Sequence, residues 1–435
     1  MRRFFTHLAI VLVCVLPVVA FTAALLIVVP APSYMLALAS VAVTEKSFVP
    51  GTVGLVVALV AGRVLRGRSR ALINLIRLAG LATFALCLVP PIQALRVARA
   101  SGTDLDLGRY LMSSLDHRGG RAPRTVEFTA IAGRSLFMDI YPAVNASATS
   151  PRRAIVIVHG GGWSAGDKGE GSQASAWLAG RGFHVFDVQY RLAPEGRWRE
   201  ATADIKCAVG FIKRSNARSL GLTVDPERVA LLGRSAGGQL AMLAAFAAED
   251  DSLPASCPTG DSSVDAVISF YGPTDLRWGY EHPSNPRVYD TSGRLRGFLG
   301  GPPTGVGDPY DRASPTVRAH PGAPPVLLIH GGSDQFVSPL HIGRLQAKLA
   351  PQGVLVRTLE IPYARHGFDF VFGGLGGQLA EAAILRFFKE VEERKKRGDS
   401  KTGDGSTTRS RSRPDAGPVR IAPTLVPGAA RPSLD

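Results

Sequence analysis

Three long apolar segments occupy much of the first 100 residues, at positions 8–29, 47–62 and 71–92. The first has 22 residues and no charge, so a helix rising about 1.5 Å per residue would carry it across a hydrocarbon core of about 30 Å. The second is near the lower length limit for spanning, and a buried or interfacial helix is its alternative. The third carries Asn74 and Arg77 near its start. We therefore predict an all-helical membrane region over residues 1–100, with about three transmembrane helices.

From Thr125 onward the pattern changes to short β-rich runs separated by helical stretches. The runs at 126–131 and 136–141, joined by a turn that contains Gly133, predict an antiparallel hairpin. Continuous apolar runs, typical of strands buried on both faces, follow at 154–158, 184–188, 229–232, 264–270, 326–329 and 354–361. The alternation predicts an α/β domain over residues 125–393, after a linker at 101–124. Its mostly parallel eight-stranded sheet should carry helices on both faces.

The charge of the chain is unevenly distributed. The net charge of +15 consists of +9 in residues 1–100 (10 basic, 1 acidic), 0 in residues 101–393 (30 and 30) and +6 in residues 394–435 (10 and 4). A nucleic-acid-binding protein should carry its basic surface on the folded domain, so we expect a membrane partner and no nucleic acid. The last segment, 394–435, is poor in hydrophobic residues and rich in Ser, Arg, Gly and Pro, which predicts a disordered basic tail.

The orientation in the membrane follows from the arginines. A cluster between the second and third apolar segments, together with Arg2 and Arg3 at the N-terminus, marks the cytoplasmic side by the positive-inside rule; the cluster is Arg63, Arg66, Arg68 and Arg70. Three spans then place residues 101–435 on the exterior face of a multi-pass membrane protein. Cleavage of the first segment as a secretory signal is an alternative, and it leaves two spans and the same exterior placement.

The four cysteines give little information about compartment or metal binding. Cys14 and Cys87 lie in apolar segments, where buried thiols are common. Cys207 and Cys257 can pair only if the fold brings them together, so a disulfide between them stays open. None of the four has metal-ligand spacing, and we predict no metal and no cofactor.

Chemistry in such sheets gathers where parallel strands end. The run at 229–232 is followed by Gly233-Arg234-Ser235-Ala236-Gly237 and then by a helical stretch, which is the strand–turn–helix context of a nucleophile elbow. We therefore predict Ser235 as a catalytic nucleophile. A serine hydroxyl needs a base to take its proton, and histidine is suited to that near neutral pH.

His366 is the candidate base among nine histidines, because it follows the last strand in a glycine-flanked loop. Asp334 follows the preceding strand and can orient the imidazole, giving the chain order Ser235, Asp334, His366. A turn-capping role is the alternative for Asp334. The other candidate acids are Asp308, Asp311 and Asp369.

Donors for an oxyanion are expected from the backbone amides of Gly161, Gly162 and Ala236. A phosphate-binding loop is the alternative for the glycines, but no Lys-Ser/Thr pair completes such a motif. Residues 279–311 are polar, rich in Pro and Gly, and form a candidate lid. Aromatic residues near the strand ends are candidates for a substrate pocket, with plain packing as the alternative; they are Trp163, Trp278, Tyr280 and Phe368.

These motifs together resemble the HGGG-type carboxylesterases of the α/β-hydrolase fold, the hormone-sensitive-lipase-like group, over about residues 125–393. The matching stretches are HGGGW at 159–163, GDK at 166–168, YRLAPE at 190–195, GRSAGG at 233–238, YGPTDL at 271–276, Ser314-Pro315 and HGGSD at 330–334. GDK and the apolar N-terminus also resemble the branch that contains isoprenylcysteine methylesterases. The resemblance implies Ser235 as nucleophile, His366 as general base and acid, Asp334 as its partner, and an oxyanion hole at Gly161, Gly162 and Ala236.

The chain departs from that group in its N-terminus, which is apolar and Arg-flanked where the group carries a cap of helices. Our expectation is a membrane-anchored serine hydrolase that cleaves small-molecule or lipid-derived carboxylic esters through an acyl-enzyme. An acyltransferase or peptidase of the same fold, acting on cell-envelope or lipidated substrates, is one alternative. A non-catalytic membrane binding module is another, and the oligomeric state stays open.

Overall fold

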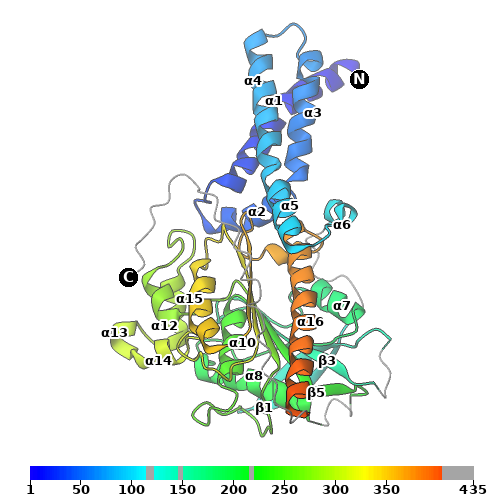
Figure 1. The fold of residues 1–435 in the computed structure, drawn as a ribbon. Helices are drawn as coiled ribbons and strands as arrows, with labels where there is room; N and C mark the ends of the chain where they lie inside the picture. The colour runs from blue at the N-terminus through cyan, green and yellow to red at the C-terminus, as the bar shows by residue number, and fades with distance from the viewer. Residues whose placement is uncertain (114–121, 146–149, 215–219, 404–435) are drawn as a thin grey trace.

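The computed structural model describes residues 1–113, 122–145, 150–214 and 220–403. Its N-terminal part is a helical bundle that stands on an α/β domain (Figure 1). The bundle consists of α1 (Arg2–Val28), α2 (Tyr34–Glu45), α3 (Phe48–Val64), α4 (Arg70–Cys87) and α5 (Val89–Ser101).

Part of the bundle has the length and composition of membrane spans. Two stretches, Phe4–Val28 and Arg70–Ser101, are long and apolar enough to cross a membrane, and a third exists if α2 and α3, bent by 74° at their junction, count as one. Close packing of α3 on α4 depends on small residues, because a Cβ on Gly54 would meet the Gly80 carbonyl oxygen at 2.6 Å. Val18 and Leu78 stay exposed, as lipid-facing side chains would be.

The α/β domain is built on one eight-stranded sheet with the order β1-β2-β4-β3-β5-β6-β7-β8. Strand β2 is antiparallel to β1 and to β4, and the other neighbours are parallel. The strands are β1 (Arg124–Ile131), β2 (Arg134–Tyr141), β3 (Arg152–Val158), β4 (His184–Val188), β5 (Val224–Arg234), β6 (Ala266–Phe270), β7 (Val326–Gly331) and β8 (Val356–Ile361). The predicted fold class is therefore confirmed.

Helices cover both faces of the sheet, which explains why its strands are apolar without alternation. Val156 and Val158 of β3 pack on one side with α8 (Trp198–Lys213), α10 (Ala236–Phe246) and α15 (Leu340–Leu349). Ile155 and Ile157, the alternate residues, pack on the other side with α7 (Ser172–Gly180), α16 (Leu375–Gly403) and α5. The last helix of the bundle thus shares a core with the α/β domain.

The connections hold further short elements. The predicted lid, residues 279–311, contains α12 (Thr291–Leu299) and α13 (Pro303–Val306) and overlaps α11 (Leu276–Glu281) and α14 (Asp308–Arg312). The predicted linker contains α6 (Leu107–Leu111). Two single turns are η1 (Ala350–Gln352) and η2 (Phe368–Phe370). Helix α16 continues into the segment expected to be a disordered tail, because strong helix formers fill residues 389–397. The rest of that tail, residues 404–435, and residues 114–121 of the linker lie outside the described residues.

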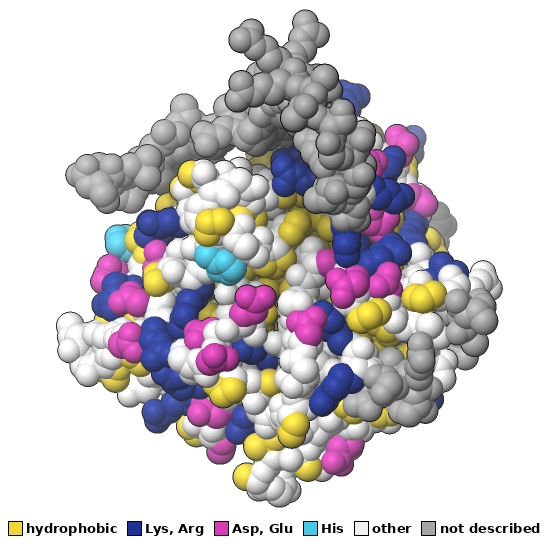
Figure 2. Space-filling model, turned by 60° about the horizontal axis from the view of Figure 1, so that its bottom comes forward, with side chains coloured by type: hydrophobic (Ala, Val, Ile, Leu, Met, Phe, Trp, Pro, Cys, Tyr) yellow, Lys and Arg dark blue, Asp and Glu magenta, His cyan; other side chains and the backbone are white. Residues whose placement is uncertain are grey.

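Cys207 of α8 and Cys257 form a disulfide with a Cα–Cα distance of 5.4 Å, whereas Cys14 and Cys87 are free. On the face of the α/β domain turned away from the bundle, acidic and basic side chains are interspersed (Figure 2). This mixture agrees with the balanced charge of residues 101–393.

Candidate active site

Ser235 lies in the tight turn between β5 and α10. Its backbone adopts φ 54° and ψ −121°, a conformation that costs energy for a residue with a side chain and that the surrounding chain must hold in place. A Cβ on Gly233 would meet the Gly237 carbonyl oxygen at 2.1 Å, and a Cβ on Gly237 would meet the Val158 carbonyl oxygen at 2.2 Å. The two glycines are therefore required for the turn, which presents the serine at the N-terminus of α10.

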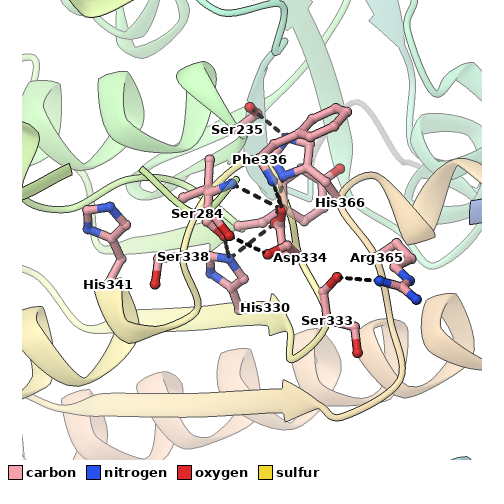
Figure 3. A network of polar contacts seen from close by, with 12 residues as sticks. Ser235, Ser284, His330, Ser333, Asp334, Phe336, Ser338, His341, Arg365 and His366 are labelled. Carbon is pink, nitrogen blue, oxygen red and sulfur yellow. Dashed lines mark hydrogen bonds and ion pairs between the residues drawn. The ribbon is translucent and has the colours of Figure 1, made fainter. Parts of the chain in front are cut away.

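His366 and Asp334 complete a line of hydrogen bonds with Ser235 (Figure 3). Nε2 of His366 lies 2.9 Å from Ser235 Oγ, and its Nδ1 lies 2.6 Å from Asp334 Oδ2. Asp334 follows β7, His366 follows β8, and Ser235 follows β5. Because the three strands are parallel within one sheet, their carboxyl ends bring the three loops together.

Asp334 is buried and fully hydrogen-bonded. Its Oδ1 accepts the amide hydrogens of Phe336 at 2.8 Å and Val337 at 3.0 Å. Its Oδ2 lies 3.2 Å from Nε2 of His330, in addition to the contact with His366. Burial alone would raise the pKa of Asp334, but the imidazoles of His366 and His330 lower it below its usual range. The carboxylate is therefore ionised at neutral pH and its orientation is fixed.

The glycine-rich loop after β3 lies over Ser235. Among the residues that the structure describes, the amides of Gly161, Gly162 and Ala236 have no hydrogen-bond acceptor, and these residues line the cavities next to Ser235. Unpaired backbone donors beside a serine hydroxyl are the groups that stabilise an oxyanion. The buried His159 ring holds the loop, stacking on Tyr190 at 4.3 Å between ring centroids. Burial lowers the pKa of His159.

Comparison with known proteins finds esterases. Residues 138–349 match the BD-FAE family model. The chain is 35% identical to Esterase LipC of Mycobacterium tuberculosis over 257 residues, which are 56% of this chain and 59% of LipC. It therefore spans less than two thirds of that relative's length. Residues 138–349 form a BD-FAE domain with the α/β-hydrolase fold.

Two further likenesses are to a methylesterase and to an esterase of known structure. The isoprenylcysteine alpha-carbonyl methylesterase ICME of Arabidopsis thaliana is 27% identical over 211 residues, 46% of each chain. The structure of Thermogutta terrifontis esterase 2 phosphonylated by sarin has a TM-score of 0.51 and 25% identity, over 63% of this chain and 95% of that one. Both matches are shorter than the present chain.

The other candidate acids of the hydrolase are engaged elsewhere. Asp369 accepts hydrogen bonds from Arg234 and from Tyr271, each at 2.5 Å. Asp311 pairs with Arg277 at 2.7 Å, and Asp308 lies 3.5 Å from Arg312 of the same short helix. None of the three carboxylates contacts His366.

Of the predicted pocket residues, Trp163 lines the narrow cavity beside Ser235, where its indole stacks on Phe298 and its Nε1 donates to Gln239 at 2.8 Å. Trp278, Tyr280 and Phe368 line neither of the cavities that reach Ser235. Each is used for packing, since Trp278 stacks on His282, Tyr280 packs edge-on against Tyr310, and Phe368 is fully buried against Tyr271. The prediction for these three residues does not fit the geometry.

Sequence reasoning missed the residues that join the bundle to the catalytic loops. Gln335 exchanges two hydrogen bonds with Ala31, at 2.8 and 3.0 Å. Arg365 donates to the carbonyls of Leu26 at 2.7 Å and Ile27 at 3.0 Å, at the end of α1. Gln335 directly follows Asp334 in the sequence, and Arg365 directly precedes His366. Only that adjacency could have drawn attention to them.

The described residues contain no group of three or more His, Cys, Asp or Glu side chains arranged to hold a metal ion.

Proposed function

We propose that this protein is a membrane-anchored serine hydrolase that cleaves carboxylic esters through an acyl-enzyme. The observation that carries the proposal is the continuous line of hydrogen bonds from Ser235 through His366 to Asp334. At one end of this line, the Ser235 hydroxyl faces a cavity that is lined by unpaired backbone amides.

The reaction would begin when Ser235 Oγ attacks the ester carbonyl while Nε2 of His366 takes the hydroxyl proton. Asp334 stabilises the resulting imidazolium, and the amides of Gly161, Gly162 and Ala236 stabilise the negative oxygen of the tetrahedral intermediate. The C–O bond to the alcohol then breaks, and His366 returns its proton to the departing alkoxide. Water, deprotonated by the same imidazole, attacks the acyl-enzyme and releases the acid, and Ser235 recovers its proton.

Small-molecule carboxylic esters are the substrate class that the comparisons support, because LipC is named an esterase and ICME a methylesterase. Thermogutta terrifontis esterase 2 is described as phosphonylated by sarin. A serine activated as Ser235 is here should react in the same way with a fluorophosphonate.

For the membrane placement we propose that α1, α3 and α4 cross the bilayer and that α2 lies at its surface. The bundle supports this arrangement, because the N-terminus and the α3–α4 connection are at the end away from the α/β domain (Figure 1). That connection carries Arg66 and Arg68, which favour the cytoplasm. The α/β domain, with the disulfide Cys207–Cys257, would then lie on the exterior face, where disulfides persist.

Ester hydrolysis by the full-length protein tests the proposal. Wild-type protein in detergent should hydrolyse p-nitrophenyl butyrate, and Ser235→Ala should reduce kcat to the background level while the protein stays folded. Ser292→Ala, with a hydroxyl that only donates to the Tyr280 carbonyl, is the matched control and should keep full activity. Turnover by Ser235→Ala equal to that of wild type would refute the assignment.

Reporter fusions test the topology separately. A reporter after Arg68 should be active inside the cell, and a reporter after Ile92 should be active outside. An intracellular signal from the fusion after Ile92 would refute the exterior placement.

A further inference from the structure

The largest described cavity at the active site is shared between the hydrolase and the membrane bundle. Its volume is about 1230 Å³, and its lining includes Ser235 and His366. Ligand pockets for drug-sized molecules are usually about 300–1,000 Å³, so this cavity has room for a larger substrate. One wall is formed by α2, through Tyr34, Leu38, Ala39, Val41 and Ala42.

Helix α2 is fixed next to the catalytic histidine by stacked aromatic rings. The ring of Tyr34, the first residue of α2, lies 5.4 Å from that of Phe336, which also stacks on Tyr289 at 4.8 Å. Phe336 in turn lies 5.1 Å from the imidazole of His366, between ring centroids. The α2 wall is therefore part of the site's structure.

Another part of the cavity lining is polar. The segment after the glycine-rich loop contributes Asp167, Lys168 and Glu170, and Arg294 comes from α12. The ammonium of Lys168 lies 3.2 Å from Asp139, which also lines the cavity. A cavity with an apolar helix on one wall and charged groups on another matches an amphipathic molecule.

The position of α2 shows where such a molecule would come from. The helix lies between the apolar bundle and the α/β domain (Figure 1) and is bent by 74° from α3. Several of its apolar side chains are exposed, including Met35 at 70%, and Leu36 and Leu38 at 41% each. With the bundle in the bilayer as proposed above, these exposed apolar side chains would contact the hydrocarbon core or its boundary.

We propose that α2 is the hydrocarbon-binding wall of the active site and that the substrate is a lipid ester with a long hydrocarbon chain, drawn from the bilayer. The inference rests on the proposed ester hydrolysis at Ser235 and adds the substrate class to it. The hydrocarbon chain of the substrate contacts Leu38, Ala39 and Ala42 while its ester carbonyl reaches Ser235 Oγ. The bonds formed and broken are those of the acyl transfer described above.

Two leucines of α2 provide a matched test, because both are 41% exposed and only Leu38 lines the cavity. Full-length wild type, Leu38→Gln and Leu36→Gln would be reconstituted in phosphatidylcholine vesicles. The substrates are p-nitrophenyl butyrate (short), p-nitrophenyl dodecanoate (long acyl chain) and dodecyl acetate (long alcohol chain).

We expect Leu38→Gln to lower kcat/KM for at least one long-chain ester about tenfold more than it lowers kcat/KM for the butyrate, through loss of apolar contact. Leu36→Gln should match wild type on all three esters. The long substrate that loses activity identifies whether the acyl or the alcohol chain lies on α2. Ala39→Trp, which fills the same cavity, should produce the same selective loss.

The outcomes separate this inference from the proposed function. Hydrolysis of no ester by wild type would overturn the proposed function itself. If wild type hydrolyses the butyrate but Leu38→Gln leaves the long esters unaffected, lowers all three equally, or is matched by Leu36→Gln, the α2 wall is refuted and the esterase proposal stands.

Discussion

Replacing Asp334 by asparagine isolates the contribution of the buried carboxylate to catalysis. The amide oxygen of the asparagine can still accept from the Phe336 and Val337 amides, which lie 2.8 and 3.0 Å from Oδ1 of the wild-type residue. Its NH₂ group then replaces Oδ2, the atom that lies 2.6 Å from Nδ1 of His366. The shape of the loop is preserved while the acceptor for the imidazole N–H is lost.

The size of the effect follows from the tautomer of His366. Facing an NH₂ group, Nδ1 must act as acceptor, so the ring hydrogen moves to Nε2. That nitrogen lies 2.9 Å from Ser235 Oγ and can no longer take the hydroxyl proton. The equivalent change in a serine protease triad lowers kcat by about 10⁴-fold, which corresponds to about 5.5 kcal/mol of barrier height. We expect a loss of that order.

The assay is kcat for p-nitrophenyl butyrate, with thermal unfolding measured on the same samples. Asp369→Asn is the matched control, because Asp369 is also a buried carboxylate near the site but bonds to Arg234 and Tyr271. It should destabilise the domain by about 3–5 kcal/mol, since the buried Arg234 charge loses its partner, and should keep kcat within tenfold. Loss of less than tenfold in Asp334→Asn, or a larger loss in Asp369→Asn, would refute the assigned order of proton transfer.

Three further predictions concern other residues. Gly162→Ala places a Cβ 2.5 Å from the Tyr289 hydroxyl at a backbone φ of 59°; displacement of its amide should lower kcat about 10²-fold, and an unchanged kcat would argue against its role as donor. Burial raises the pKa of the Asp187 carboxyl to about 8 in the folded protein, whereas in the unfolded chain the same carboxyl ionises above about pH 3.9. Between these two values the folded state holds one more proton than the unfolded state, so the contribution of Asp187 to stability falls as pH rises from about 4 to 8. Asp187→Asn should therefore stabilise the protein more at pH 8 than at pH 5 in denaturant unfolding, and an equal effect at both would contradict the shift. Cys207→Ser/Cys257→Ser opens a disulfide of sequence separation 50 and should lower the free energy of unfolding by about 4 kcal/mol; an unchanged unfolding midpoint would show that the bond does not form.

The sheet and the catalytic loops could be predicted because their signals are local. A strand buried on both faces is a continuous apolar run, as at residues 154–158, and the turn around Ser235 needs Gly233 and Gly237 at fixed spacing. His366 and Asp334 follow strands that the pattern already marks. The parallel topology then brings their loops together without further information.

The features that were missed depend on contacts between distant segments. Helix α2 has an ordinary apolar sequence, and its role at the cavity follows only from the bend to α3 and the docking of Ala31 on Gln335. Trp278 and Phe368 lie near strand ends, as pocket residues do, but neighbouring rings bury or stack them. Tertiary packing decides whether a side chain points toward a cavity or away from it. The position of a residue along the chain does not predict that orientation.

The most direct test of the central claim is the mass spectrum of the Ser235 peptide after the full-length protein is treated with a fluorophosphonate. The account predicts one covalent adduct on Ser235, formed by displacement of fluoride, which is absent from Ser235→Ala and forms far more slowly in His366→Ala. An unmodified Ser235 in active, folded wild type, or an adduct on a different serine, would contradict it.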